Sequence, residues 1–136
     1  MLHAAAATFR ANSGYAIVEP AHMELAQPDI PTAFQRCVEQ GAEIVIVFPY
    51  FLSPGRHWSE DIPRLVQNAA VRYPDVQWLV TAPFGLHPAM NQIIKDRIRH
   101  CLEQTFPSAT NDASPIGCDV CGTEPRCSSR NSSRAP

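Results

Sequence analysis

Three short segments of the 136-residue chain combine a histidine with other polar side chains. The richest is residues 53–61, Ser-Pro-Gly-Arg-His-Trp-Ser-Glu-Asp, where His57 stands next to Arg56 and close to two carboxylates. A histidine binds divalent metals through its neutral ring and exchanges a proton near neutral pH. The segment therefore indicates a metal or proton-transfer site. The alternative is structural: Ser59 or Asp61 caps the following helix, and His57 is a solvated loop residue.

The other two segments are residues 19–24, with His22 and Glu24, and residues 84–88, with His87. The first is expected to end a strand and the second to follow one, and parallel sheets bind ligands beyond the carboxyl ends of their strands. We therefore expect a polar cleft with metal-ligand character at this edge. The alternative is that His22 packs in the core and that His87 only precedes a helix-starting proline. No HExxH, P-loop or GxGxxG pattern supports a zinc protease, a nucleotide phosphate site or a dinucleotide site.

A second group of potential metal ligands consists of cysteines. Cys118, Cys121 and Cys127 form the pattern CxxC-x5-C, and Cys101 precedes them on a predicted helix. Four thiolates would suit either zinc or an iron–sulfur cluster, and the spacing alone does not choose between the two. The odd total of five cysteines argues against a disulfide scaffold. Cys37 is predicted to be a small core hydrophobe, which is also the alternative for Cys101.

The composition predicts one globular domain followed by a tail. The length and the 45% hydrophobic content suit a single modest core. The net charge of −2 gives no basic excess for nucleic acid, and no apolar run approaches the roughly 20 residues that span a membrane. Residues 107–136 are rich in Ser, Pro, Asn, Gly and Arg, which cannot offset their ordering entropy unaided. We expect a domain at 1–106 and an irregular tail at 107–136, disordered after about residue 128.

Turn residues and apolar periodicity predict an α/β fold with a small parallel sheet flanked by helices. The strand at 43–52 is nearly all apolar, as expected for a strand buried on both faces. Because the series opens with a helix, we expect the first strand of such a sheet to be absent from this chain. The predicted helices are 2–10, 31–41, 62–73 and 88–104, and the predicted strands are 15–25 with a break at Pro20, 43–52 and 76–82.

Three blocks of sequence resemble the class II chelatases of the CbiX/SirB type, which insert cobalt or ferrous iron into sirohydrochlorin. The blocks are VEPAHMEL at 18–25, PYFLSPGRHWSEDIP at 49–63 and TAPFGLHP at 81–88, and the resemblance covers about residues 1–106. The cysteine tail resembles that of the plastid sirohydrochlorin ferrochelatases of plants and algae, which carry a [2Fe–2S] cluster. The chain departs from the family in lacking the first strand and its His-Gly-Ser-Arg type segment.

The resemblance implies that the chain inserts Fe²⁺, its substrate metal, into sirohydrochlorin to make siroheme. His57 and Glu24 match the family's catalytic and metal-binding residues, and the oxygen of Glu24 suits Fe²⁺. The residues with an implied role in substrate binding are Arg56, His87 and His22. The implied ligands of the [2Fe–2S] cluster are Cys101, Cys118, Cys121 and Cys127.

The resemblance also implies a homodimer in the plastid stroma, with the tetrapyrrole as partner and neither nucleic acid nor a membrane. Two alternatives stay open. One is a catalytically impaired relative that only binds metal or an iron–sulfur cluster. The other is a cobaltochelatase that acts on the same tetrapyrrole.

Overall fold

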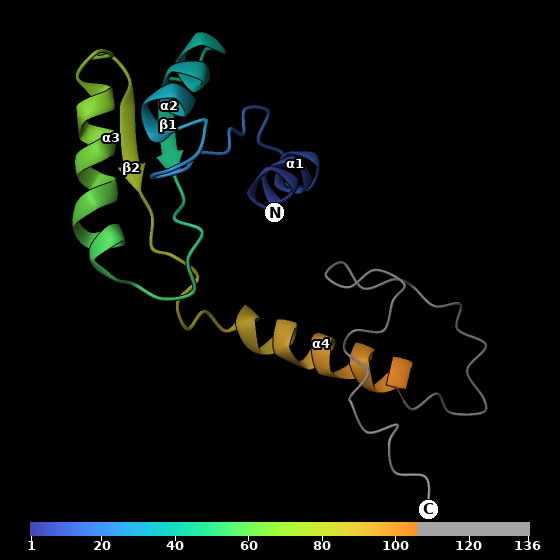
Figure 1. Ribbon diagram of the computed structural model, residues 1–136. Coiled ribbons are helices and arrows are strands. Elements are labelled where there is room, and N and C mark those ends of the chain that lie inside the picture. Colours follow the sequence, from blue (N-terminus) through green and yellow to red (C-terminus); the bar gives the residue numbers. More distant parts are fainter. Residues whose placement is uncertain (106–136) are drawn as a thin grey trace, which may run out of the picture. The chain divides into compact units, whose positions relative to one another are not determined.

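The computed structural model describes residues 1–105 as helices, strands and connecting loops. They divide into two units, Met1–Gly85 and a second that begins at Leu86, which are described separately. The predicted tail at 107–136 and its predicted disorder lie outside the described residues. The elements are α1 (Leu2–Ser13), α2 (Ile30–Glu39), β1 (Ile44–Val47), the π-helical turn η1 (His57–Asp61), α3 (Ile62–Ala70), β2 (Gln77–Val80) and α4 (Ala89–Thr105) (Figure 1).

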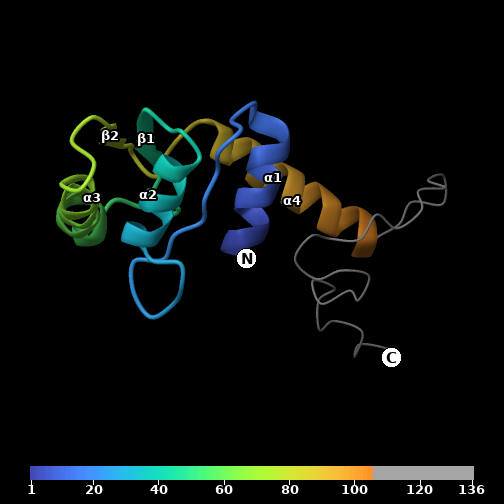
Figure 2. The same cartoon turned by 90° about the horizontal axis from the view of Figure 1, so that it is seen from above.

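The first unit is built around a parallel pair of strands. β1 and β2 pair in register from Ile44 with Gln77 to Val47 with Val80. α2 packs on β1, α3 packs on β2, and the two helices pack against each other. Figure 2 shows both helices on the same side of the sheet. The predicted α/β class with a parallel sheet is confirmed.

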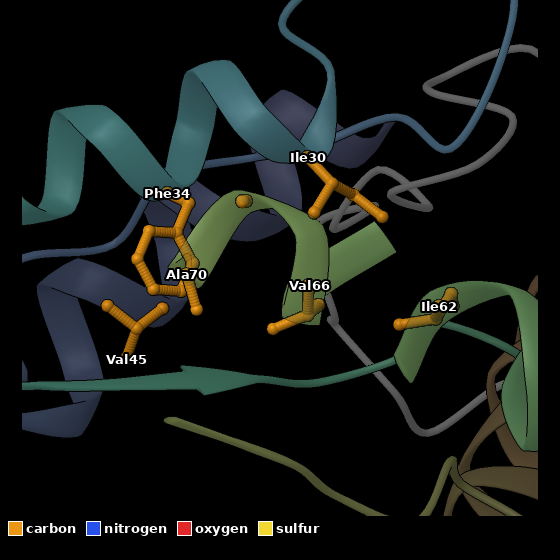
Figure 3. Close-up of a cluster of buried hydrophobic side chains, with 7 residues drawn as sticks. Ile30, Phe34, Val45, Ile62, Val66 and Ala70 are labelled. Carbon is orange, nitrogen blue, oxygen red and sulfur yellow. The ribbon is translucent and has the colours of Figure 1, made fainter. Parts of the chain in front are cut away.

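The core lies between the sheet and these two helices. Val66 of α3 is fully buried and Phe34 of α2 is 2% exposed, and both belong to the same buried cluster as Val45 of β1 (Figure 3). Within the first unit the predicted burial of this strand on both faces is not found, because α2 and α3 cover one face only. Ile44 and Ile46, which alternate with Val45, are 54% and 49% exposed.

The predicted strand at 15–25 is also wrong. Among residues 1–105 its only ladder contact is an isolated bridge between His22 and Asp29. The Val18 carbonyl instead accepts a hydrogen bond from the Arg10 guanidinium at 3.0 Å. Pro20 has no N–H to donate, so an extended segment here cannot complete a ladder.

The helix boundaries follow local signals. Asp29 caps α2, since its Oδ1 accepts from the Thr32 N–H at 2.9 Å, and Pro31 occupies the first turn as predicted. Gly14 ends α1 in the left-handed conformation, with φ of 79°. In the second unit α4 matches the predicted helix 88–104. Within residues 1–105, none of the helices has the length and apolarity that a membrane span requires.

Candidate active site at the carboxyl end of β1

The loop that follows β1 ends in the π-helical turn η1. The Ile62 N–H donates to the His57 carbonyl, which closes the wide i to i+5 turn. The Gly55 carbonyl accepts the backbone N–H groups of Trp58 and Ser59, both at 3.0 Å. Turns of this type are rare and often stand at functional sites. The turn separates His57 from α3, which begins at Ile62 as predicted.

Two contacts tie this loop to the loop that follows β2. The Trp58 indole N–H donates to the Thr81 carbonyl at 2.8 Å, and the Phe84 N–H donates to the Phe51 carbonyl at 3.1 Å. Both contacts lie beyond the carboxyl ends of the paired strands. The segment that carries His57 is therefore fixed at the sheet edge where parallel sheets bind ligands.

His57 has one carboxylate partner. Its Nδ1 lies 3.0 Å from Oδ2 of Asp61, whose other oxygen lies 3.2 Å from the Arg64 guanidinium. The hydrogen bond with His57, and then that with Arg64, lowers the pKa of the Asp61 carboxyl. The His57 side chain is 61% exposed. Asp61 stands at the N-cap position of α3 but its side chain makes no capping hydrogen bond, so the structural alternative of an Asp61 cap is not supported.

Glu24 lies on a loop that is held at its base rather than at its tip. The His22 N–H donates to the Pro28 carbonyl at 2.8 Å, and Asp29 then starts α2. Glu24 itself is exposed, and Leu25 beside it is fully exposed with a left-handed φ of 64°. Figure 2 shows this loop extending beyond the start of α2.

The three predicted substrate-binding residues have different surroundings. Arg56 is exposed and pairs with Glu60 at 3.6 Å. His22 is half-buried, and its ring centroid lies 5.7 Å from that of His3. In the second unit, Nδ1 of His87 accepts the Ala89 N–H at 3.2 Å. This bond supports the helix start at α4, and it leaves the proton of a neutral ring on Nε2.

The metal assignments stay predictions. Across residues 1–105, no three His, Cys, Asp or Glu side chains lie close enough together to hold a metal ion. Three of the predicted cluster ligands, Cys118, Cys121 and Cys127, lie outside the described residues. Cys101 is a half-buried free thiol on α4.

Cys37 fits the prediction of a small core hydrophobe. It packs half-buried against the core cluster, and burial, together with the nearby charge of Glu19, raises the pKa of its thiol.

Two residues of this site were not foreseen in the roles they have. From the sequence Asp61 is only an alternative helix cap, yet its side chain binds His57. Trp58 is only one residue of the polar loop, yet it anchors the turn. The first partnership has a sequence signal, because side chains four residues apart face each other on a helical turn. The second has none, since Trp58 and Thr81 are joined only by the pairing of β1 with β2.

The CbiX family model matches residues 1–101. The chain belongs to the CbiX family. It is 46% identical over 125 residues to the chloroplastic sirohydrochlorin ferrochelatase of Arabidopsis thaliana, covering 92% of this chain and 53% of that protein. It is 38% identical over 82 residues to the sirohydrochlorin ferrochelatase of Priestia megaterium, covering 60% of this chain and 31% of the relative. The chain thus spans about half or less of the length of these two CbiX relatives.

The fold agrees with this family. The solved structure of SirB from Bacillus subtilis with Fe³⁺ superimposes with a TM-score of 0.65 at 29% identity, covering 78% of this chain and 41% of SirB. The parallel sheet flanked by helices is therefore the CbiX/SirB type of sheet that the sequence predicts.

Proposed function

We propose that this chain acts as a sirohydrochlorin ferrochelatase, which inserts Fe²⁺ into sirohydrochlorin. The observation that carries the proposal is the position of His57. It lies exposed beyond the carboxyl end of β1, with one ring nitrogen bonded to Asp61. Within residues 1–105 no hydrogen bond occupies the other ring nitrogen, Nε2. The lone pair of this nitrogen can therefore bind a metal ion. The names of the Arabidopsis and Priestia relatives support iron as the metal.

The proposed chemistry exchanges one Fe²⁺ for two protons. The ion enters the macrocycle as both pyrrole N–H groups lose their protons, so the site must present the metal and accept protons. His57 can bind Fe²⁺ through its open nitrogen and can accept a proton once the ion has left. Glu24 would supply a second ligand, through a carboxylate oxygen, and a second proton acceptor. Arg56, His22 and His87 can donate hydrogen bonds to the carboxylates of the substrate.

The direct test is siroheme formation followed by its visible absorbance. We expect the chain to form siroheme from Fe²⁺ and sirohydrochlorin, and His57→Gln to lower the rate by at least about 100-fold, since a positioned base and ligand is lost. His100→Gln on α4 is the matched control and should keep the rate. A wild-type rate equal to that without protein would overturn the proposal, and an unchanged rate in His57→Gln would overturn the role of His57.

Glu24 is tested with the same assay. Glu24→Gln removes the charged oxygen ligand and should lower the rate by roughly 10- to 100-fold, whereas Glu43→Gln at another exposed position should not. Repeating the assay of the wild-type chain and both variants with Co²⁺ in place of Fe²⁺ identifies the preferred metal. Faster insertion of Co²⁺ than of Fe²⁺ by the wild-type chain would favour a cobaltochelatase instead.

We further propose that residues 107–136 form a tail distinct from the 1–106 domain, and that its cysteines bind a [2Fe–2S] cluster. Cys101, a half-buried free thiol, is the ligand available on the described residues. With Cys118, Cys121 and Cys127 it would make an all-thiolate set, which suits such a cluster. When bound, the cluster would supply a one-electron redox centre.

Anaerobic purification tests the cluster. The wild-type chain should show charge-transfer absorbance with equal iron and sulfide, and Cys101→Ser should lose it while Cys37→Ser keeps it. A colourless chain that holds stoichiometric zinc would contradict the assignment.

The remaining proposals concern assembly and location. A homodimer is supported by the apolar face of the sheet that α2 and α3 leave uncovered in the first unit, where Ile44, Ile46 and Leu79 are 44–54% exposed. Light scattering that gives twice the chain mass is expected, and a monomer mass at high concentration would contradict it.

Location in the plastid stroma is supported by the chloroplastic Arabidopsis relative. Fluorescent tagging of the native gene product tests it.

A further inference from the structure

The contact between His57 and Asp61 restricts where the imidazole proton lies. Nδ1 of His57 is 3.0 Å from Oδ2 of Asp61, and the Arg64 guanidinium holds the other carboxylate oxygen at 3.2 Å. An ionised carboxylate only accepts hydrogen bonds, so the nitrogen that faces it must carry the hydrogen. In a neutral ring this leaves Nε2 without a proton and with its lone pair free.

Hydrogen bonds of the turn fix the distance between the His57 and Asp61 side chains. His57 and Asp61 are the first and last residues of η1, whose closing bond runs from the Ile62 N–H to the His57 carbonyl. The bond from Trp58 to the Thr81 carbonyl anchors the same turn to the end of β2. The imidazole and the carboxylate therefore lie on the same hydrogen-bonded turn, and their spacing does not depend on a distant side chain.

We propose that Asp61 is a positioning residue, which holds His57 in the Nδ1–H tautomer so that an unprotonated Nε2 faces the incoming metal. Metal-binding histidines in proteins commonly donate their second ring N–H to a carboxylate, which fixes both tautomer and orientation. The inference rests on the proposed function, since it presumes that His57 meets the metal.

The chain holds an internal reference for this assignment. Nδ1 of His87 accepts a backbone N–H from Ala89, so its neutral ring must carry the proton on Nε2. His57 and His87 are therefore expected to show opposite tautomers in the same molecule.

The test is a long-range ¹H–¹⁵N spectrum of the full chain at about pH 8.5, where imidazoles are neutral. Wild-type His57 should show a protonated Nδ1 and His87 a protonated Nε2. Asp61→Asn and Asp61→Ala should shift His57 toward Nε2–H, because an amide can donate to Nδ1 and alanine offers no acceptor. Arg64→Gln should keep the wild-type tautomer of His57, since it leaves the carboxylate in place.

Metal binding gives the second measurement. Co²⁺ titration of Asp61→Asn should show an affinity about 10- to 100-fold below that of the wild-type chain. Asp96→Asn is the matched control, because Asp96 also pairs with an arginine three residues on, Arg99 at 2.8 Å. Its Co²⁺ affinity should not change.

The outcomes separate this inference from the proposed function. A wild-type His57 in the Nε2–H form, or a tautomer unchanged in both Asp61 variants, would overturn the role of Asp61. If the tautomers follow the expectation but His57→Gln forms siroheme at the wild-type rate, the orientation by Asp61 holds and the chelatase role of His57 fails.

Discussion

His57 and Glu24 lie on segments that the molecule holds in different ways. The turn at His57–Asp61 buries no residue, and side-chain hydrogen bonds from His57 and Trp58 fix it. The loop around Glu24 has an anchored base, where Pro28 and Ile30 are buried, and an exposed tip. The orientation of His57 is thus set by polar contacts close to it. The position of Glu24 is set by apolar packing several residues away.

The difference teaches how each segment would respond to change. Polar contacts in a solvent-exposed turn contribute modestly to stability but decide the direction of a side chain. Buried apolar anchors contribute more to stability and leave the tip of a loop free to adopt several directions. Substitutions in the Glu24 loop base should therefore affect folding, whereas those in the His57 turn should affect the site.

Ile30→Ala should have the largest effect on stability. Ile30 is 7% exposed and packs in the core directly after the loop that bears Glu24. Removing a buried isoleucine costs about 2–5 kcal/mol, and urea unfolding followed by circular dichroism measures the loss. Val71→Ala at a 75% exposed position is the control, with a cost within about 1 kcal/mol. Equal costs would mean that the loop base is not anchored by packing.

Trp58→Phe should have a smaller effect on stability and a clear effect at the site. It keeps an aromatic ring but removes the donor to the Thr81 carbonyl, which costs about 0.5–1.5 kcal/mol. Backbone amide shifts of His57 should move in a ¹H–¹⁵N spectrum. Trp78→Phe on β2, at a 36% exposed position, is the control, because it makes the same change of ring away from the His57 turn. The same response in both variants would show that the Trp58 bond does not hold the turn.

Local features were predictable from the sequence, and features that depend on distant pairing were not. The start of α2 follows from Asp29 and Pro31, whose capping and first-turn roles need only neighbouring residues. The strand expected at 15–25 failed because a strand needs a partner, and apolar alternation does not say whether one is present. The exposure of Ile44 was missed for the same reason, since periodicity does not tell which helices cover a face.

The same distinction between local and non-local features applies to the candidate site. The place of the segment around His57, after a strand and before a helix, was predictable from the local sequence, whereas its role stays a proposal. The bond from His57 to Asp61 requires the π-helical turn and a particular rotamer, which composition does not reveal.

The acid sensitivity of the loop base follows from Asp29. Hydrogen bonds with Thr32 hold the pKa of the Asp29 carboxyl below its usual value of 3.8. A carboxyl whose pKa is lowered by folding stabilises the fold above pH 3.8 and loses this contribution as the pH falls through the lower, folded-state pKa. Asp29→Asn keeps a capping oxygen without the charge. The drop in urea midpoint from pH 7 to pH 3 should therefore be smaller in Asp29→Asn than in wild type.

The control for the acid titration is Asp75→Asn, at an exposed position between α3 and β2. Its midpoint should fall between pH 7 and pH 3 by as much as that of the wild-type chain. A wild-type-like drop in Asp29→Asn would show that the cap at α2 does not contribute to acid sensitivity.

Leu25→Gly should have the smallest effect and the opposite sign. Leu25 is fully exposed with φ of 64°, a conformation that costs a residue with a side chain about 1–2 kcal/mol. Glycine removes this cost but loses about 0.5–1 kcal/mol more in chain entropy on folding, so a net gain of up to about 1 kcal/mol in the free energy of unfolding is expected. Leu86→Gly, at another fully exposed position, should lower the stability. A loss in Leu25→Gly equal to that in Leu86→Gly would mean that the tip beside Glu24 is unstrained. The loop would then be shaped by local preference, as the His57 turn is, and not by its anchored base.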